Sequence, residues 1–225
     1  MYEDVIPTLK QAYDNHAGER NTADLADWKI VECEHFLALL QSEGKQSLLE
    51  IGAGPGHFGA FFRDRGLDVT CTDLSPEMVR LCRQKGLTAH VMDFLHLDFP
   101  PVSFDAVFAL NCLLHVPGVD LDRVLAAVQQ LLRPGGLFFY GVYGGHSFEG
   151  VWPEDHHDPK RYFVFYPDDE LRRRVAERFD EVSFRAIQLE DDRESHFQSL
   201  ILRPRSFLAP TDGISNAGIK GSSAV

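Results

Sequence analysis

Three glycines stand at alternate positions, Gly52, Gly54 and Gly56, directly after the short apolar run 47–51. A glycine has no Cβ, so its backbone can adopt positive φ and come into contact with ligand atoms. Residues 57–65, which follow, are predicted to be helical, and the first turn of a helix offers free N–H groups and a partial positive charge. A strand, a glycine turn and a helix in this order predict a binding site for a nucleotide-like ligand.

The glycine spacing alone leaves two kinds of cofactor open. A fingerprint for nicotinamide or flavin dinucleotides has Gly-x-Gly-x-x-Gly starting directly after the strand. In that register the third glycine position is occupied by His57. Gly54, Gly56 and Gly59 match the letters but begin two residues late. An NAD- or FAD-dependent oxidoreductase is therefore an alternative that the register of the glycines disfavours.

Acidic residues fall at the ends of the first three predicted strands: Glu50, Asp73 and Asp93. Asp73 lies 21 residues after Gly52, a spacing at which a carboxylate reaches a ribose and accepts hydrogen bonds from its two hydroxyls. Asp93 could accept a hydrogen bond from an adenine amino group, with the ring of Phe94 beside the base. The alternative is that these residues have structural roles. Asp73 would then stabilise the start of the following helix, Asp93 would be a loop acid, and Phe94 would pack in the core.

Strands and helices alternate around these residues. Strands are predicted at residues 47–51, 67–73, 88–92, 104–110 and 137–143. Helices are predicted at residues 57–65 and 121–132, and a further one begins at Ser75, Pro76 and Glu77, which have the pattern of an N-cap, a first-turn proline and a first-turn acid. This alternation predicts a parallel, doubly wound sheet, in which ligands bind beyond the carboxyl ends of the strands.

The flanking segments are expected to complete this unit. Residues 1–46 are predicted to be mainly helical, with an amphipathic helix over 24–41 and a polar loop over 13–20 that forms either a lid or a surface connection. We expect Asn21, Thr22 or Asp24 to cap that helix.

Residues 144–165 show no clear period and are predicted to be a long functional loop. A helix is expected over 168–179, with Asp168 or Asp169 as its cap. Strands over 181–189 and 196–202, joined by the acidic turn 190–194, are expected to form a hairpin whose last strand runs antiparallel. Residues 206–225 are expected to be disordered.

Over roughly residues 45–145 the chain resembles the class I S-adenosylmethionine-dependent methyltransferases. The resemblance is carried by Glu50 with the glycine turn, the acids of the second and third strands, the run 105–116 and the turn 133–136. It implies an α/β, Rossmann-like fold with a doubly wound seven-stranded sheet, mostly parallel with an antiparallel C-terminal hairpin strand. It also implies S-adenosyl-L-methionine as cofactor and S-adenosyl-L-homocysteine as product.

The resemblance also assigns residues to the site. In this family the glycine turn holds the methionine portion, the second-strand acid the ribose, and the third-strand acid lies near adenine. The cofactor-binding residues implied here are Glu50, Gly52, Ala53, Gly54, Gly56, Asp73, Leu74, Met78, Asp93, Phe94, Asn111 and Leu113. The candidates for catalysis or acceptor contact are His115, His146 and Tyr143, with Asn111, His156 and His157 on neighbouring loops. Because methyl transfer needs mainly alignment, a base is required only if the acceptor arrives protonated.

We expect one methyltransferase domain over residues 1–205, followed by the tail 206–225. Within it, residues 1–43 are expected to form a helical lid or cap, residues 44–145 the cofactor-binding core, and residues 146–205 a substrate-side loop, helix and hairpin.

The loop before residue 168 contains further polar and aromatic side chains whose role the sequence leaves open. Asp155, His156 and His157 stand in an acidic and histidine-rich stretch, but adjacent histidines point apart on most backbones and no His-x-x-x-His spacing is present, so no metal is expected. Arg161 is a candidate for binding a substrate carboxylate or for a salt bridge. An aromatic acceptor pocket, or packing of the loop on the core, is expected for Trp152, Tyr162, Phe163, Phe165 and Tyr166.

Composition limits the class of protein. The 225 residues suffice for one sizeable domain, and the formal net charge of −12 argues against nucleic acid or an anionic membrane as the main partner. The four cysteines show no metal or disulfide spacing. No signal peptide and no apolar run of ~18 residues is recognised. We therefore expect a cytoplasmic monomer or homodimer that acts on a small-molecule methyl acceptor. A tRNA or protein acceptor, and a non-catalytic protein that only binds the cofactor, are the alternatives.

Overall fold

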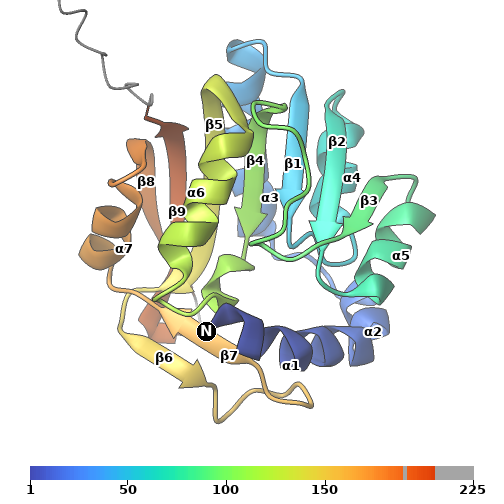
Figure 1. The fold of residues 1–225 in the computed structure, drawn as a ribbon, viewed down its shortest axis with the longest axis vertical. Coiled ribbons are helices and arrows are strands. Elements are labelled where there is room, and N and C mark those ends of the chain that lie inside the picture. The colour runs from blue at the N-terminus through green and yellow to red at the C-terminus, as the bar shows by residue number, and fades with distance from the viewer. Residues whose placement is uncertain (190–191, 206–225) are drawn as a thin grey trace, which may run out of the picture.

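The computed structural model describes residues 1–189 and 192–205. Its elements along the chain are shown in Figure 1. They are α1 (Tyr2–Asn15), α2 (Ala17–Thr22), α3 (Asp27–Ser42), β1 (Ser47–Ile51), α4 (His57–Arg63), β2 (Asp68–Asp73), α5 (Pro76–Gln84), β3 (Thr88–Val91), β4 (Phe104–Leu110), η1 (Leu113–His115), α6 (Leu121–Leu131), β5 (Leu132–Gly144), β6 (Phe148–Val151), β7 (Tyr162–Phe165), α7 (Asp168–Val175), β8 (Phe179–Leu189) and β9 (Asp192–Pro204).

Seven strands form one sheet in the order β3-β2-β1-β4-β5-β9-β8. β1 lies at the centre and pairs in parallel with β2 and β4, while β3 and β5 extend the parallel part on either side. β9 runs antiparallel to both β5 and β8. The predicted fold class is therefore confirmed: an α/β, Rossmann-like sheet of seven strands, mostly parallel, with an antiparallel strand in the C-terminal hairpin.

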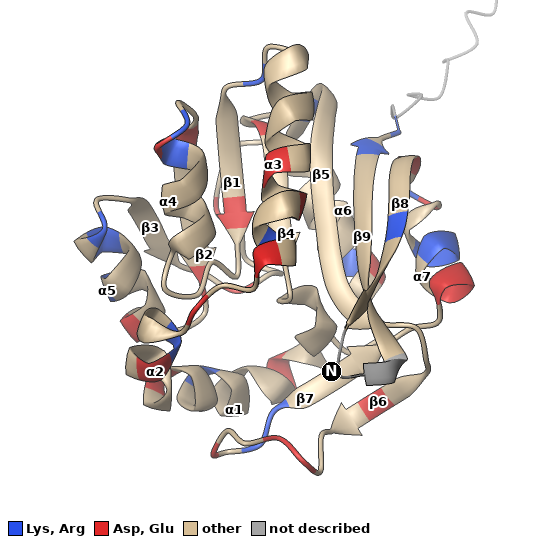
Figure 2. Cartoon of the chain, turned by 180° about the vertical axis from the view of Figure 1, so that it is seen from behind, with Lys and Arg blue, Asp and Glu red and all other residues tan. Residues whose placement is uncertain are grey.

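Both faces of the sheet are covered by helices, because successive side chains of a strand point to opposite faces. Leu48 packs with α3 and α4 on one face, whereas its neighbour Leu49 packs with α6 on the other. Figure 1 shows α6 in front of the sheet. Figure 2, seen from the opposite side, shows α3 and α4 in front of it. The continuous apolar runs of β1 and β4 follow from this burial on two sides.

The N-terminal segment is helical, but its division differs from the prediction. Residues 13–20 are not a loop: they belong to α1 and α2, apart from His16 between them. Tyr2, Leu9 and Ala12 form the buried stripe of α1, a helical spacing that Pro7 in mid-helix obscures. Figure 1 shows α1 and α2 lying beyond the arrowheads of β2 and β4. This segment thus covers the carboxyl edge of the sheet.

Helix starts were predicted with mixed success. Ser75 caps α5 as expected, since its Oγ accepts a hydrogen bond from the Met78 N–H at 3.1 Å. The predicted caps of α3 and α7 are wrong: the N-cap positions are Ala26 and Pro167, and neither makes a side-chain cap hydrogen bond.

The segment 144–165 contains regular structure that the sequence did not predict. β6 and β7 pair antiparallel as a separate two-stranded sheet, four residues each. β5 begins at Leu132, earlier than predicted, so the turn 133–136 lies within it and its register against β4 shifts there. The acidic turn was predicted over 190–194, but residues 192–194 belong to β9. Residues 190 and 191 of that turn and the predicted tail 206–225 lie outside the described residues.

Among the described residues, no helix has both the length and the apolar composition that crossing a membrane requires.

Candidate active site

The three glycines of the turn after β1 all have positive φ, +63° at Gly52, +56° at Gly54 and +82° at Gly56. They serve different purposes. A Cβ at Gly52 would lie against the Cβ of Cys112 and 2.9 Å from its Sγ, so this glycine allows the turn to pack on the loop after β4. A Cβ at Gly54 would meet only an Arg20 nitrogen, 4.0 Å away. The backbone at Gly54 is therefore open toward a cavity.

Asp73, at the end of β2, fixes this turn. Its two carboxylate oxygens accept hydrogen bonds from the backbone N–H groups of Gly54, at 2.7 Å, and Ser75, at 2.9 Å. Burial raises the pKa of the carboxyl, and the same two hydrogen bonds oppose that shift. Each oxygen has a second lone pair, so Asp73 can still accept hydrogen bonds from a ligand.

Glu50, at the end of β1, lies beneath the turn and is 2% exposed. Burial raises the pKa of its carboxyl to about 8, although hydrogen bonds from the Cys71 thiol and the Gly59 backbone partly oppose the shift. A carboxyl with this pKa is largely protonated at neutral pH, in contrast to an exposed glutamate.

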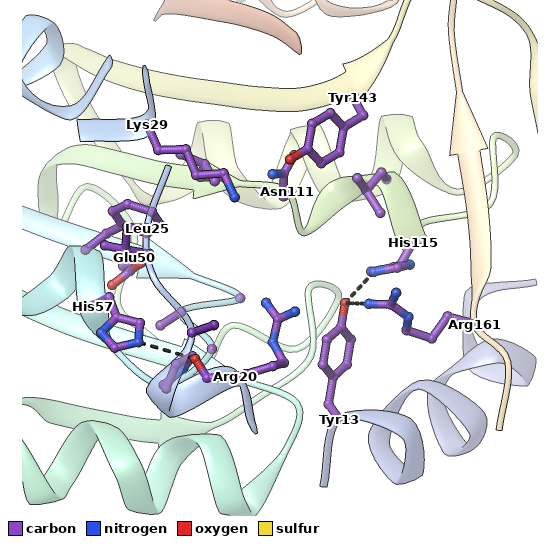
Figure 3. A pocket seen from close by; sticks show the side chains of 18 of the residues that line it. Tyr13, Arg20, Leu25, Lys29, Glu50, His57, Asn111, His115, Tyr143 and Arg161 are labelled. Carbon is purple, nitrogen blue, oxygen red and sulfur yellow. Dashed lines mark hydrogen bonds between the residues drawn. The ribbon is translucent and has the colours of Figure 1, made fainter. Parts of the chain in front are cut away.

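A cavity of about 280 Å³ opens beside the glycine turn, and Figure 3 shows the side chains that surround it. A smaller cavity of about 50 Å³ extends toward Asp73, Leu74 and Phe94. Gly52, Gly54 and Asn111 are among the residues that line both. The two cavities therefore adjoin at the glycine turn, between the end of β2 and the end of β4.

A chain of polar side chains closes the far side of the larger cavity. The Tyr13 hydroxyl lies 2.6 Å from Nε2 of His115 and accepts a hydrogen bond from Arg161 at 3.1 Å (Figure 3). Arg161 in turn binds both carboxylate oxygens of Asp155, with its Nη2 at 2.7 Å and its Nε at 2.9 Å. Three elements distant in sequence, α1, η1 and the loop before β7, meet in this chain.

His115 is held in one state by its surroundings. Its Nδ1 lies 2.6 Å from the carbonyl oxygen of Tyr162, which can only accept, so Nδ1 carries the proton. Nε2 is then the acceptor for the Tyr13 hydroxyl. Burial lowers the pKa of His115 to about 3. The imidazole is thus neutral at physiological pH, with a lone pair directed at Tyr13.

Two cations, Arg20 and Lys29, line the same cavity. In Figure 3 both head groups point inward, Arg20 from α2 and Lys29 from α3. Neither forms an ion pair with a carboxylate of the described residues; Arg20 lies over the ring of Tyr13 and Lys29 over that of Trp28. Burial lowers the pKa of Lys29. The cavity therefore offers positive charge in a protein that is acidic overall.

The structure brings most of the residues singled out from the sequence to these cavities. Those that line them are Glu50, Gly52, Ala53, Gly54, Asp73, Leu74, Phe94, Asn111, His115, Tyr143, Arg161 and Phe163. The side chain of Asn111 lies beside the Tyr143 hydroxyl (Figure 3), and its Oδ1 is buried without a hydrogen-bond partner.

Other predicted residues do not line these cavities. Gly56 is the N-cap of α4, and Met78 and Leu113 are buried in the core. Asp93 accepts hydrogen bonds from the backbone of Leu95 and the ring of His96, each at 2.8 Å.

The substrate-side loop supplies less of the cavity than expected. His146 packs on Phe165 within this loop. Trp152 packs on Phe148 and Phe165, so this part of the aromatic loop serves packing. Arg161 is both a salt-bridge partner and a cavity residue.

Sequence reasoning missed Tyr13, Arg20 and Lys29 as individual site residues. The apolar stripe of α1 was the available signal, because it places Tyr13 next to the buried Ala12 on the face that covers the sheet edge. One expectation in the loop is wrong: the rings of His156 and His157 do not point apart, since their centroids lie 4.4 Å from each other. The chain bends at His157, whose side chain is buried while that of His156 is exposed.

Comparisons with known proteins bear on this site. Residues 49–140 match the family model of the methyltransferase domain. The chain is 30% identical over 118 residues to malonyl-[acyl-carrier protein] O-methyltransferase of Serratia marcescens, covering 52% of this chain and 46% of that protein. The protein of the same description from Geobacter sulfurreducens is 28% identical over 202 residues, 81% of this chain and 73% of that one. The chain spans about half the length of several curated relatives that it matches.

A solved structure has the same fold. It is 1,6-didemethyltoxoflavin-N1-methyltransferase of Burkholderia thailandensis with bound 1,6-didemethyltoxoflavin and S-adenosylhomocysteine, with a TM-score of 0.71 and 21% identity, covering 92% of this chain and 91% of that one. Together with the sheet order and the glycine turn after β1, these matches show that the chain is similar to S-adenosylmethionine-dependent methyltransferases, in sequence over residues 49–140 and in fold over most of its length.

Proposed function

We propose that this protein transfers a methyl group from S-adenosyl-L-methionine to a small-molecule acceptor and releases S-adenosyl-L-homocysteine. The observation that carries the proposal is that two cavities, one lined by Asp73 and the other by His115, adjoin at the open backbone of Gly54 and at Tyr13. A cofactor and an acceptor placed in these adjoining cavities would lie next to each other, as the reaction requires.

The residues present fit the cofactor. The second lone pairs of the Asp73 carboxylate suit the ribose hydroxyls, and the ring of Phe94 lies where it could contact adenine. The Gly54 backbone faces the position of the methionine portion, and Arg20, above it and without a carboxylate partner, suits the methionine carboxylate. The unpartnered Oδ1 of Asn111 lies in the same space. The role of each residue is part of the proposal.

When bound, the cofactor supplies a methyl group on a sulfonium sulfur that is open to in-line displacement. The chain contributes enclosure, because α1 covers the carboxyl edge of the sheet, and a hydrogen-bonding group for the acceptor. The Tyr13 hydroxyl donates its proton to Nε2 of His115, so its oxygen can accept a hydrogen bond from an acceptor O–H or N–H and align that acceptor for displacement. Arg161, which donates to the same oxygen, fixes its position.

Charge and size favour a small acceptor. The net charge of −12 disfavours nucleic acid, and the cavity is partly closed by α1. Two curated relatives are malonyl-[acyl-carrier protein] O-methyltransferases, and the Burkholderia enzyme was solved with 1,6-didemethyltoxoflavin. These names support an acceptor that is a small molecule or a small group. The monomeric or homodimeric state stays part of the proposal.

Calorimetric titration tests the cofactor first. We expect S-adenosylmethionine and S-adenosylhomocysteine to bind, and NADH and FAD not to bind. Asp73→Ala should weaken both by about 10-fold or more, because it removes the ribose acceptor and the hydrogen bonds that fix the glycine turn. Asp98→Ala, at an exposed aspartate away from the cavity, is the matched control. The proposal would be overturned if NADH or FAD bound tightly, or if neither S-adenosylmethionine nor S-adenosylhomocysteine bound.

Single-turnover release of S-adenosylhomocysteine with a panel of small acceptors then tests transfer. A protein that binds the cofactor but releases no product with any acceptor class, tRNA and protein included, would be the non-catalytic binder of the alternative.

A further inference from the structure

Three histidine rings meet where the end of α1 approaches the loop between β6 and β7. The ring centroid of His157 lies 4.3 Å from that of His16 and 4.4 Å from that of His156. The centroids of His16 and His156 are 6.4 Å apart. The Oδ1 atom of Asp155 lies 3.4 Å from Nδ1 of His157 and 3.9 Å from Nδ1 of His156. Figure 2 shows this loop running beside α1. Two segments far apart in sequence thus lie together: ligand atoms of Asp155, His156 and His157 fall within 4.8 Å of one another, and the ring of His16 lies beside that of His157.

His157 is the centre of this group and lacks a partner. The residue is 3% exposed, and neither Nδ1 nor Nε2 makes a hydrogen bond. A neutral imidazole has a nitrogen lone pair that a cation can use. A buried polar group without a partner is costly. A bound cation would supply the missing partner.

The spacing of the donors suits tetrahedral zinc. Zinc lies about 2.0–2.2 Å from nitrogen and oxygen ligands, which places ligand atoms about 3.3 Å apart in a tetrahedron. One ligand atom each from Asp155, His156 and His157 already lies within 4.8 Å of the other two. Binding would draw these three ligand atoms closer together, and His16, whose ring centroid lies 6.4 Å from that of His156, would move toward them as the fourth ligand.

Neighbouring groups orient two of the donors. Nδ1 of His16 lies 2.9 Å from the Ala12 carbonyl oxygen, which leaves Nε2 as its donor atom. Arg161 occupies one lone pair of Asp155 Oδ1 at 2.7 Å and leaves another for a cation. Outer hydrogen bonds of this kind are typical of metal ligands.

We propose that Asp155, His156 and His157, together with His16, form a binding site for a late first-row divalent cation such as Zn²⁺. The ion would fasten the end of α1 to the loop before β7, next to the hydrogen bond from the Asn15 amide to the Asp158 carbonyl at 2.8 Å. None of the four ligands lines the cavities described above. The inference does not require methyl transfer, although Asp155 also binds Arg161, which donates to the Tyr13 hydroxyl.

The test uses the full chain freed of metal with a chelator. Calorimetric titration with Zn²⁺ should show one equivalent bound, and Co²⁺ in its place should give the visible absorption of a four-coordinate site. His156→Ala should weaken Zn²⁺ binding by about 10-fold or more; its side chain is 71% exposed, so folding should be unaffected. His157→Asn should abolish binding. His35→Ala, at an exposed histidine on α3, is the matched control.

Thermal unfolding gives a second readout. Zn²⁺ should raise Tm of the unmodified chain and of His35→Ala, but not of His156→Ala. The proposal is overturned if Zn²⁺ does not bind, if His156→Ala binds it as tightly as the unmodified chain, or if His35→Ala weakens binding equally. Titration of the metal-free chain with S-adenosylhomocysteine separates this result from the fate of the proposed enzyme function.

Discussion

Position 52 shows how one missing side chain shapes the site. Gly52→Ala adds two costs: φ of +63° is unfavourable for alanine, and the new Cβ would collide with Cys112. Gly44→Ala is a matched control, because Gly44 has φ of +66° but open space around it. We expect the control to lose about 1 kcal/mol of unfolding free energy and Gly52→Ala about 2–4 kcal/mol. Urea unfolding of both variants measures the difference, and equal losses would contradict the packing role of Gly52.

Glu50 makes a prediction about pH. Its pKa in the folded protein is about 8 against an ordinary value of 4.5, so between these values the folded chain keeps a proton that the unfolded chain has released. The folded state then binds more protons, and its stability falls as pH rises. From pH 6 to 8 the unmodified chain should lose stability relative to Glu50→Gln, by up to about 1.4 kcal/mol per pH unit. Urea unfolding at pH 6, 7 and 8 gives the difference; parallel pH profiles would refute the shift.

The Tyr13 hydroxyl is predicted to act in transfer and not in cofactor binding. Tyr13→Phe keeps the ring and removes the group that lies between His115 and Arg161. Because this hydroxyl would align the acceptor, kcat should fall by about 10²-fold, while the Kd of S-adenosylhomocysteine changes little. Tyr162→Phe is the control, since that hydroxyl binds Glu149 at 2.9 Å. A Tyr13→Phe enzyme with unchanged kcat would show that Tyr13 does not align the acceptor.

At the scale of elements, α1 is held at both ends over the carboxyl edge of the sheet. The Tyr2 backbone N–H donates to Asp120 at 2.7 Å, and the Tyr2 ring stacks on Phe94 at 5.8 Å. Near the other end, Asp14 accepts a hydrogen bond from the Ser75 hydroxyl. We predict that these contacts open when a ligand enters beneath α1, so that α1 acts as a lid.

The hold of Asp14 on this lid can be measured by hydrogen exchange. Amides of α1 should exchange faster in Asp14→Ala than in the unmodified chain, and S-adenosylhomocysteine should slow them in both. The affinity for S-adenosylhomocysteine should fall by about 3–10-fold, because part of the binding energy is used to order α1. Lys10→Ala, at an exposed position of the same helix, should leave both properties unchanged. If the ligand leaves exchange in α1 unaltered, α1 is not its lid.

The elements differ in how far the sequence could predict them. β1, β4 and the start of α5 were predicted because their signals are local: an apolar run buried on both faces, or the cap of Ser75 with Pro76 after it. The extent of α1 was missed because Pro7 interrupts its pattern, and β6 and β7 are too short to show a period. The glycine turn could be predicted from its spacing, but the contact of Tyr13 with His115, 102 positions apart, depends on tertiary packing.

At the scale of the whole molecule, the cysteines lie on both faces of the sheet, so their reactivity shows whether the packing on each face has opened. Cys33, Cys71 and Cys82 are buried on the face of α3 and α4, and Cys112 is buried on the face of α6. Burial raises the pKa of the Cys33 and Cys112 thiols, which further suppresses the reactive thiolate. A thiol reagent can therefore reach each of them only after part of the structure opens.

We expect an aromatic disulfide reagent to react with all four thiols in guanidinium chloride and with none of them rapidly in the native protein. Native reaction should be slower by about 10³-fold or more, in line with the rarity of open states in a stable domain. If the thiols are exposed only by unfolding of the whole domain, all four should react at a single rate. That rate should fall as the free energy of unfolding rises. If α1 opens independently, Cys112, which lines the smaller cavity beneath it, should react first, and S-adenosylhomocysteine should slow that phase alone. If Cys33, Cys71 or Cys82 reacted at once in the native protein, the packing described for the face of α3 and α4 would be contradicted.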